Sequence, residues 1–374
     1  MNLHRRNLLA LSAAGAATGA LPAAASAQDP IKGSIVINTL GGLSDPNLSD
    51  LDADVGPSLR VLDDARASGM TAANITLGYV AGDAEPFEQS VREVVQWDGI
   101  VRRHPDRLLK VLTSEDIRRA KAENKIGLIF GFQNAAQMGD RVDRVDLFAD
   151  MGVRVVQLTY NLKNQVGGGA LAPVGTPLTP FGREVLERLN ARRIIVDLSH
   201  SGEQTCLDAA RATKSPIAIT HTGCRALADL PRNKTDEELR LVASKGGYVG
   251  IYFMPFLHVD RQITADDVIN HIEHAMKVCG EDAVGIGTDG GTTGIDDMEG
   301  WKKAFAAQIM RRRSLGISAP GERPDSFVFA IDMHGPEQFR ILAQKMARRG
   351  HSSRVIDKVL GLNFLRFAKD IWGA

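Results

Sequence analysis

Short apolar runs rich in β-branched residues recur along the chain and alternate with longer segments of helical periodicity. Eight such runs occur, over residues 34–38, 71–77, 125–132, 153–160, 193–200, 215–222, 246–254 and 283–289. Some are apolar at successive positions, as 126–130 and 194–196 are, which is typical of strands buried on both faces. The alternation therefore predicts repeated βα units and a parallel sheet.

The intervening segments have the length and the boundary residues of helices. They cover residues 54–68, 88–103, 114–123, 141–150, 180–191, 202–213, 236–244 and 264–279. Gly69, Gly152 and Gly246 fall where helices should stop, since glycine favours the left-handed backbone that ends a helix. Eight strands with covering helices match a closed (β/α)₈ TIM barrel better than an open sheet, and no Gly-rich dinucleotide motif follows the first strand.

The segment after the eighth strand contains no further strand pattern. Residues 290–323 are rich in Gly and Pro and predict a loop, and two closing helices are expected over 334–349 and 352–362. No second domain and no internal repeat is recognisable. Residues 28–374 are therefore expected to form one barrel domain.

The N-terminus has the features of an export signal. Arg5 and Arg6 precede an apolar run over 8–21, which ends in the small-x-small pattern of residues 25–27. The paired arginines resemble a twin-arginine signal, so residues 1–27 are predicted to be removed and the mature chain to be periplasmic. The run is shorter than the ~20 residues that a membrane-spanning helix needs, so no transmembrane anchor is expected.

Composition excludes some classes of partner and site. The chain has 45 basic and 45 acidic residues, so its net charge produces no positive electrostatic field that would attract nucleic acid. Its cysteines, Cys206, Cys224 and Cys279, are too few and too irregularly spaced for a disulfide framework or a cysteine-ligated zinc site. We interpret them as small core residues.

Candidate chemistry gathers at the ends of three predicted strands. The fifth strand ends at His200, the sixth at His221 and the eighth at Asp289. Active sites of such barrels form at the carboxyl ends of the strands, and neighbouring strands lie about 4.8 Å apart, so two histidines there can share one metal ion. The alternatives are that both histidines are ordinary polar residues that close strands and that Asp289 is a structural cap.

Several separated segments resemble one known family. They are residues 197–201 (DLSHS), 216–227 (PIAITHTGCRAL), 232–233 (RN), 284–289 (VGIGTD) and 361–366 (GLNFLR). In this order they are similar to the membrane (renal) dipeptidases, zinc peptidases of barrel fold related to the amidohydrolases. The resemblance implies that His200 and His221 bind one zinc, that Arg232 and its neighbour Asn233 contact substrate, and that Asp289 assists catalysis. It also implies a possible homodimer.

The match fails at the other half of the family's two-zinc site. Leu40 and Gly42 stand where the family has a His-x-Asp motif, and neither can ligate a metal. Gln133 replaces the bridging glutamate, and its neutral amide is a much poorer zinc ligand. Tyr160 replaces a histidine that contacts substrate. At most one Zn²⁺ is therefore expected, held by His200 and His221 with Gln133 as a weak third candidate.

Three functions fit this site. The first is a periplasmic metal-dependent hydrolase of dipeptides or small amides, with Asp289 as general base and Arg232 or Tyr160 stabilising the oxyanion. The second is a repurposed or inactive relative that matures a peptide-derived metabolite without hydrolysis. The third is a binding protein for small peptides, in which Arg232 grips a carboxylate. The fold does not choose among them, because function depends on the site.

Overall fold

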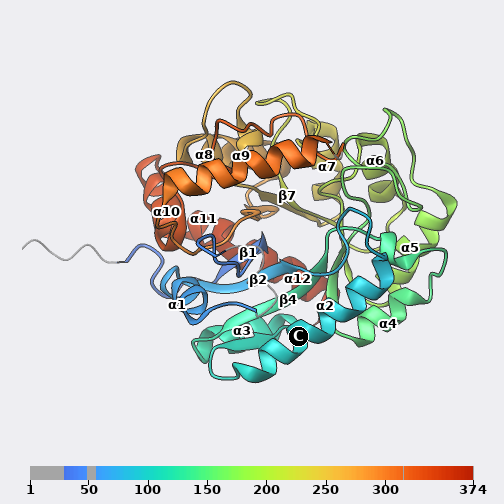
Figure 1. Ribbon diagram of the computed structural model, residues 1–374, viewed down its shortest axis with the longest axis horizontal. Helices are drawn as coiled ribbons and strands as arrows, with labels where there is room; N and C mark the ends of the chain where they lie inside the picture. Colours follow the sequence, from blue (N-terminus) through green and yellow to red (C-terminus); the bar gives the residue numbers. More distant parts are fainter. Residues whose placement is uncertain (1–28, 49–55, 315, 374) are drawn as a thin grey trace, which may run out of the picture.

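A parallel sheet rolled into a barrel, with helices around it, forms the centre of the molecule (Figure 1). The computed structural model describes residues 29–48, 56–314 and 316–373, so the predicted signal segment lies outside the described residues. Around the barrel, the strands of these ranges follow in the order β1 (Val36–Gly41), β2 (Met70–Thr76), β4 (Ile126–Phe132), β5 (Val153–Gln157), β6 (Ile195–Asp197), β7 (Ala218–Thr222), β8 (Tyr248–Ile251) and β9 (Val284–Ile286). The predicted (β/α)₈ fold is confirmed.

The barrel is closed where the first and last strands meet. Gly41 forms a parallel bridge with Gly290, and the backbone N–H of Asp289 donates to the carbonyl of Leu40 at 2.9 Å. The closure leaves no room for a side chain at Gly287, because an added Cβ would lie 2.1 Å from a backbone oxygen. The carboxyl ends of β1 and β9 are therefore held side by side, which brings Leu40 next to Asp289.

The outer layer consists of helices that follow the strands. They are α1 (Leu59–Ala67), α2 (Pro86–Arg103), α3 (Ser114–Ala122), α4 (Arg144–Asp150), α5 (Pro180–Ala191), α6 (Glu203–Ala212), α7 (Asp236–Ser244) and α8 (Ala265–Cys279). Thr235 and Glu238 form a capping box at the start of α7. Gly69, Gly152 and Gly246 have φ of 81°, 89° and 71°, in agreement with their predicted role as helix stops.

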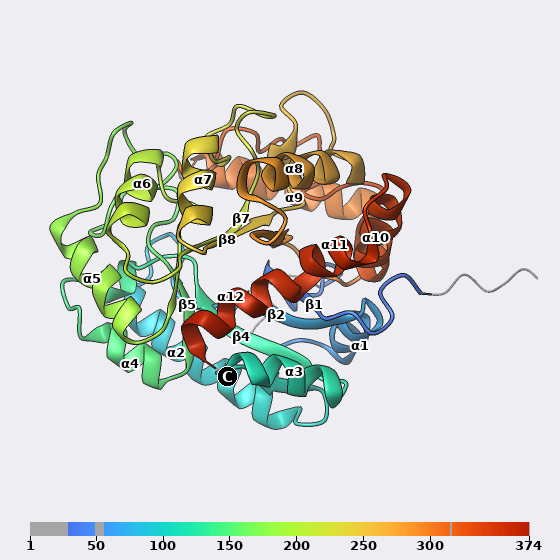
Figure 2. The same ribbon diagram turned by 180° about the vertical axis from the view of Figure 1, so that it is seen from behind.

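Two hydrophobic cores hold these layers together. The larger core lies between strands and helices, and the smaller one fills the barrel interior. The C-terminal helix α12 (Asn363–Trp372) lies across the base of the barrel (Figure 2). Its Phe364 and Phe367 pack against Tyr248. Cys206 and Cys224 are buried and unpaired, as expected of small core residues.

Three elements, β3, α9 and α12, differ from the predicted pattern. A short strand, β3 (Leu108–Lys110), pairs with β4, and α12 continues the chain beyond the last predicted helix. The closing region contains α10 (Gln338–Arg348) and α11 (Ser353–Asp357). The predicted loop over 290–323 is wrong, because α9 (Met298–Ser314) lies within it. No helix in the described part of the chain is both long enough and apolar enough to span a membrane.

Candidate active site

His200 and His221 lie side by side at the ends of β6 and β7. Their ring centroids are 5.0 Å apart and their planes are inclined by 58°. Both side chains are buried, with 4% and 0% of their surface exposed. Among the described residues, neither Nε2 atom has a hydrogen-bond partner. Two adjacent, buried and unpartnered nitrogens are what a site for a metal ion or a polar ligand requires.

Asn161 determines the tautomer of His200. The Asn161 Oδ1 atom lies 2.7 Å from His200 Nδ1, and the amide nitrogen of Asn161 donates to the carbonyl of Ile317 at 3.2 Å. Because the amide oxygen faces the ring and can only accept, His200 Nδ1 must carry the proton. The Nε2 atom of His200 is therefore left with a free lone pair.

Thr220 and Asp197 determine the tautomer of His221. The Thr220 hydroxyl donates to Asp197 Oδ2 at 2.6 Å, and its oxygen lies 3.0 Å from His221 Nδ1. Since a hydroxyl has one proton and Asp197 takes it, His221 Nδ1 must donate to Thr220. The Nε2 atom of His221 thus also presents a lone pair. A histidine whose other nitrogen is fixed by a hydrogen bond is the usual arrangement of a metal ligand.

The surroundings keep both imidazoles neutral. Burial lowers the pKa of His200 and of His221 well below the ordinary value, and the nearby charge of Arg232 lowers both further. A neutral imidazole is the form that ligates a metal. The two rings therefore do not need to lose protons before they bind a cation.

Arg232 is a fully buried cation with spare hydrogen-bonding capacity. One terminal nitrogen donates to the carbonyl of Ser199 at 2.7 Å, whereas the other has no partner among the described residues. The guanidinium also lies 5.8 Å from the ring centroid of Tyr252. An unpartnered donor on a buried cation fits a ligand that carries a carboxylate.

Asp289 has a strained backbone and a perturbed carboxyl group. Its φ is +57°, a left-handed conformation that is uncommon for a residue other than glycine. Burial raises the pKa of its carboxyl group to about 6, although the charges of Arg232 and Arg312 act in the opposite direction. A carboxyl group with a pKa near neutrality is suited to accept and return a proton.

The remaining predicted site residues occupy different positions. Tyr160 stacks on His200, with centroids 4.3 Å apart and planes inclined by 26°. Gln133 donates its side-chain N–H to Thr76 Oγ1 at 2.7 Å. Asn233 is fully buried, and its amide contacts the carbonyls of Ala228 and Phe256 and the hydroxyl of Tyr252. These hydrogen bonds hold the loop after β7, and a contact between Asn233 and substrate stays a prediction.

Sequence reasoning missed four residues that shape the site. Asn161 and Thr220 orient the imidazoles, and Asp197 holds Thr220. Arg312, on α9, forms an ion pair with Glu322; burial alone would lower its pKa, but Glu322 and Tyr160 raise it. Asp197 and Thr220 stand within the DLSHS and ITH segments, which is a usable signal. No sequence signal pointed to Arg312, because the helix that carries it was not predicted.

Within the described residues, the site offers two histidine donors for a metal ion. His200 and His221 offer two imidazole nitrogens, but no group of three or more His, Cys, Asp or Glu side chains suited to a metal gathers within residues 29–48, 56–314 and 316–373. On the β1 side, Leu40 is 3% exposed and Gly42 has no side chain. Neither of these two positions therefore supplies a metal ligand.

The chain is similar to known proteins over most of its length. Residues 69–317 match the model of the membrane dipeptidase family, peptidase family M19. An amidohydrolase structure from Pseudomonas aeruginosa is 32% identical, with a TM-score of 0.76, over 92% of this chain and 99% of that one. The structure of a probable dipeptidase from the same organism, 19% identical, has a TM-score of 0.72 over 92% and 97% of the two chains and shares the fold.

Curated sequences agree with this result. An uncharacterised protein of Klebsiella pneumoniae is 27% identical over 71% of this chain and 90% of its own length. A dipeptidase of Claviceps purpurea is 27% identical over 59% of this chain, which spans only 55% of that protein. The matched family model and the Pseudomonas aeruginosa relative both cover most of the barrel. The chain therefore belongs to the membrane dipeptidase family, whose members are metal-dependent hydrolases.

Proposed function

We propose that this protein hydrolyses dipeptides or small amides with a single zinc ion held by His200 and His221. One observation carries the proposal: the two buried rings lie side by side, and each Nε2 atom, left with a lone pair by the hydrogen bond on Nδ1, has no partner within the described part of the chain. Gln133 is the weak candidate for a third ligand, and water completes the usual coordination of a catalytic zinc.

The chain's own residues divide the remaining tasks. A zinc ion bound there supplies a Lewis acid and lowers the pKa of a bound water. Asp289, with its pKa raised to about 6, accepts the proton during attack and returns it to the leaving amine. Arg232 uses its unpartnered nitrogen to hold the substrate carboxylate. Tyr160, which stacks on His200, steadies the developing oxyanion.

A second candidate is supported by the residues that replace the family's ligands. Leu40, Gly42 and Gln133 remove the donors for the other metal ion, and the loss of half of a two-metal mechanism also fits a relative that binds or matures a peptide-derived ligand without hydrolysis. In that case Arg232 and Tyr160 would still bind the ligand. Retained hydrolysis distinguishes the two functions.

We extend the proposal to location and assembly. Arg5, Arg6 and the apolar run after them support export by the twin-arginine route and a periplasmic location. Family resemblance supports a homodimer. Size-exclusion chromatography with light scattering and fractionation of cells that express the full chain would test both.

The decisive experiment measures metal content and hydrolysis together. The purified protein is loaded with zinc, freed of excess metal, and assayed against L,L- and L,D-dipeptides. We expect one zinc per chain and cleavage of at least one dipeptide, both abolished by His200→Ala. His258→Ala is the matched control, because His258 lies in the loop after β8 and its Nδ1 atom accepts a hydrogen bond from the nearby N–H of Asp260. A zinc-loaded protein that cleaves no dipeptide would refute hydrolysis and leave the second candidate.

A further inference from the structure

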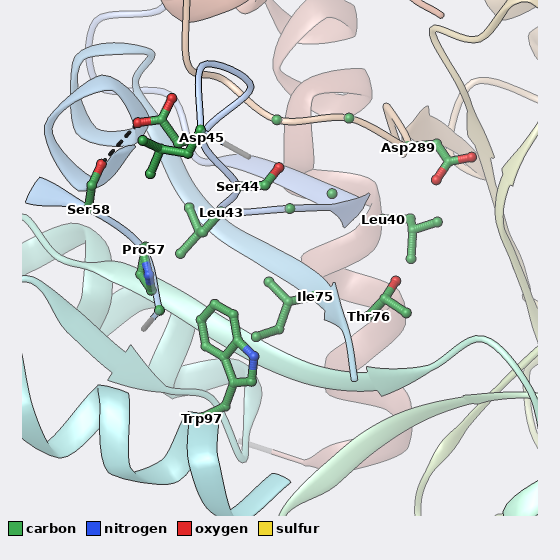
Figure 3. Close-up of a pocket in the computed structure, with 16 residues that line it drawn as sticks. Leu40, Leu43, Ser44, Asp45, Pro57, Ser58, Ile75, Thr76, Trp97 and Asp289 are labelled. Carbon is green, nitrogen blue, oxygen red and sulfur yellow. Dashed lines mark hydrogen bonds between the residues drawn. The ribbon is translucent and has the colours of Figure 1, made fainter. Parts of the chain in front are cut away.

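A pocket of about 440 Å³ lies between the ends of β1 and β2 and the helix α2 (Figure 3). Leu40, Thr76 and Asp289 stand at one end of it, and Trp97 and Pro57 stand at the other. Its volume is within the range of small-molecule sites, which run from about 300 to 1,000 Å³. The pocket therefore opens beside the candidate catalytic carboxylate.

The lining of this pocket is apolar between two polar ends. Leu40, Leu43 and Ile75 form the wall, with 3%, 6% and 1% of their surface exposed. Thr76, at the inner end, accepts a hydrogen bond from Gln133. At the outer end, the Ser58 hydroxyl donates to Asp45 at 3.2 Å. A wall of this kind offers a ligand the burial of apolar surface and few hydrogen bonds.

The pocket and Arg232 lie on opposite sides of the barrel mouth. Arg232 is anchored to the end of β6, whereas β1 is four strands away in either direction around the barrel and β2 is three strands away by the shorter path. Asp289 follows β9, next to β1. A small peptide whose carboxylate is held at Arg232 and whose amide lies beside Asp289 therefore directs its amino-terminal half toward this pocket.

We propose that the pocket binds a bulky apolar side chain of the amino-terminal residue of a dipeptide-like substrate, and that Trp97 forms its end wall. This inference rests on the proposed function, since it assigns the substrate class of the same site. Leu40 affects both the metal site and the pocket. Its side chain cannot ligate a metal, and it covers the inner end of the pocket with apolar surface.

A second pocket, of about 420 Å³, is the competing position for the same side chain. It shares Asp289, Gly290 and Gly291 with the first pocket and is lined by Trp301, Phe305 and other residues of α9 and of the segment after it. Phe253 and Thr288, which follow β8 and β9, line the second pocket as well. The first pocket is favoured because the apolar side chains of its wall, Leu40 and Ile75, belong to β1 and β2 themselves, whereas Trp301 and Phe305 belong to a helix outside the barrel.

Binding measured without turnover tests the assignment. The metal-free mature protein is titrated with Phe-Ala, Ala-Phe and Ala-Ala by calorimetry. We expect Phe-Ala to bind at least about tenfold more tightly than Ala-Ala, and Ala-Phe to lack this advantage, because burial of one aromatic side chain accounts for such a factor. Trp97→Ala should remove the preference, and Trp301→Ala, the matched change in the other pocket, should keep it.

Fluorescence locates the ligand even where truncation disturbs folding. In the Trp301→Phe protein, Trp97 reports on the first pocket, and in the Trp97→Phe protein, Trp301 reports on the second pocket. Trp372, at the base of the barrel, adds the same background emission to both proteins. Phe-Ala should change the emission of the Trp301→Phe protein alone. A change confined to the Trp97→Phe protein would assign the second pocket, and equal affinity for the three dipeptides, or no binding, would refute an apolar subsite.

The outcomes separate this inference from the proposed function. Cleavage of Ala-Ala and Phe-Ala by the zinc-loaded protein with equal kcat/KM, unaffected by Trp97→Ala, would keep the hydrolase and overturn the pocket. Selective binding of Phe-Ala without any cleavage would support the pocket and overturn hydrolysis.

Discussion

Asn161 Oδ1 lies 2.7 Å from His200 Nδ1 and determines which nitrogen of that imidazole is free. Thr220 does the same for His221, supported by the buried carboxylate of Asp197. The two histidines therefore share more than a position at the ends of neighbouring strands. Each is held in the tautomer that presents a lone pair, before any ligand arrives.

The support that Asn161 gives to His200 should be measurable as metal affinity. Asn161→Ala removes the acceptor for Nδ1–H, so the ring can rotate or change tautomer. We expect zinc affinity to fall by about 10- to 100-fold, as for other hydrogen-bond partners of metal ligands. A competition titration with a chromophoric chelator measures the change. Unchanged affinity together with an unchanged melting temperature would show that the hydrogen bond does not organise a zinc site.

Zinc should bind with a stoichiometry of one and depend on both histidines. His221→Ala leaves a single imidazole and should abolish stoichiometric binding, because two adjacent nitrogens are needed to hold the ion. Elemental analysis after dialysis measures the metal content. Two zinc ions per chain in the unaltered protein would contradict the assignment of Leu40 and Gly42 to the lost half of the site.

The carboxyl group of Asp289 should make the folded, metal-free protein less stable as pH rises. Its folded pKa of about 6 lies above the ordinary value of 3.8, so its favourable contribution is fully present below pH 4 and is lost as pH rises through 6. Asp289→Asn should therefore raise the free energy of unfolding at pH 7.5, by about 1–3 kcal/mol, and leave it unchanged at pH 4. Urea denaturation at the two pH values measures this difference.

The same substitution should also lower activity. If Asp289 acts as general base, Asp289→Asn should reduce kcat by about 10²- to 10⁴-fold and remove the acidic limb of the pH–rate profile. A variant that is more stable at pH 7.5 but fully active would identify Asp289 as a strained structural residue. A loss of both stability and activity would point instead to a structural cap.

A buried ion pair beside the site should matter for stability. Lys234 and Glu238 are 3% and 1% exposed, and Lys234 Nζ lies 3.1 Å from the Glu238 carboxylate. Glu238→Gln leaves the buried Lys234 charge without its counter-ion, although Lys234 still donates to the carbonyl of Ser201, and should destabilise the protein by about 3–5 kcal/mol. Thermal or chemical denaturation at neutral pH measures the loss.

A surface pair provides the matched control for that experiment. Arg211 and Glu237 are 54% and 63% exposed at a distance of 3.1 Å. Glu237→Gln should change stability by less than about 1 kcal/mol, because solvent screens exposed pairs. Equal effects of the two substitutions would mean that the Lys234–Glu238 pair gains nothing from its burial.

The strands and most helices were predictable because burial of one or both faces of an element produces a regular pattern of apolar residues in the sequence. Residues 126–132 form β4 within one residue of the predicted range, since both faces of that strand are buried. The helix α9 shows no such apolar pattern, because Ile309 alone among its described residues is buried. Strand β3 has three residues, too few to show a period.

The candidate site was predictable in part for a related reason. His200, His221 and Asp289 follow strands, and the topology of a parallel barrel brings such positions together whatever the loops do. The hydrogen bonds of the Asn233 amide to Ala228, Phe256 and Tyr252 were not predictable, because a motif does not reveal contacts made within the folded protein.

The sequence by itself determined the barrel and which side chains reach its mouth, because periodicity and strand order depend on local patterns of burial. The tertiary structure alone decided what those side chains can do. Asn161 and His200 are 39 positions apart, and Asp197 and Thr220 are 23 apart, so their hydrogen bonds exist only after folding. The lone pairs of the imidazoles, the raised pKa of Asp289 and the apolar pocket at Leu40 all arise from such long-range contacts.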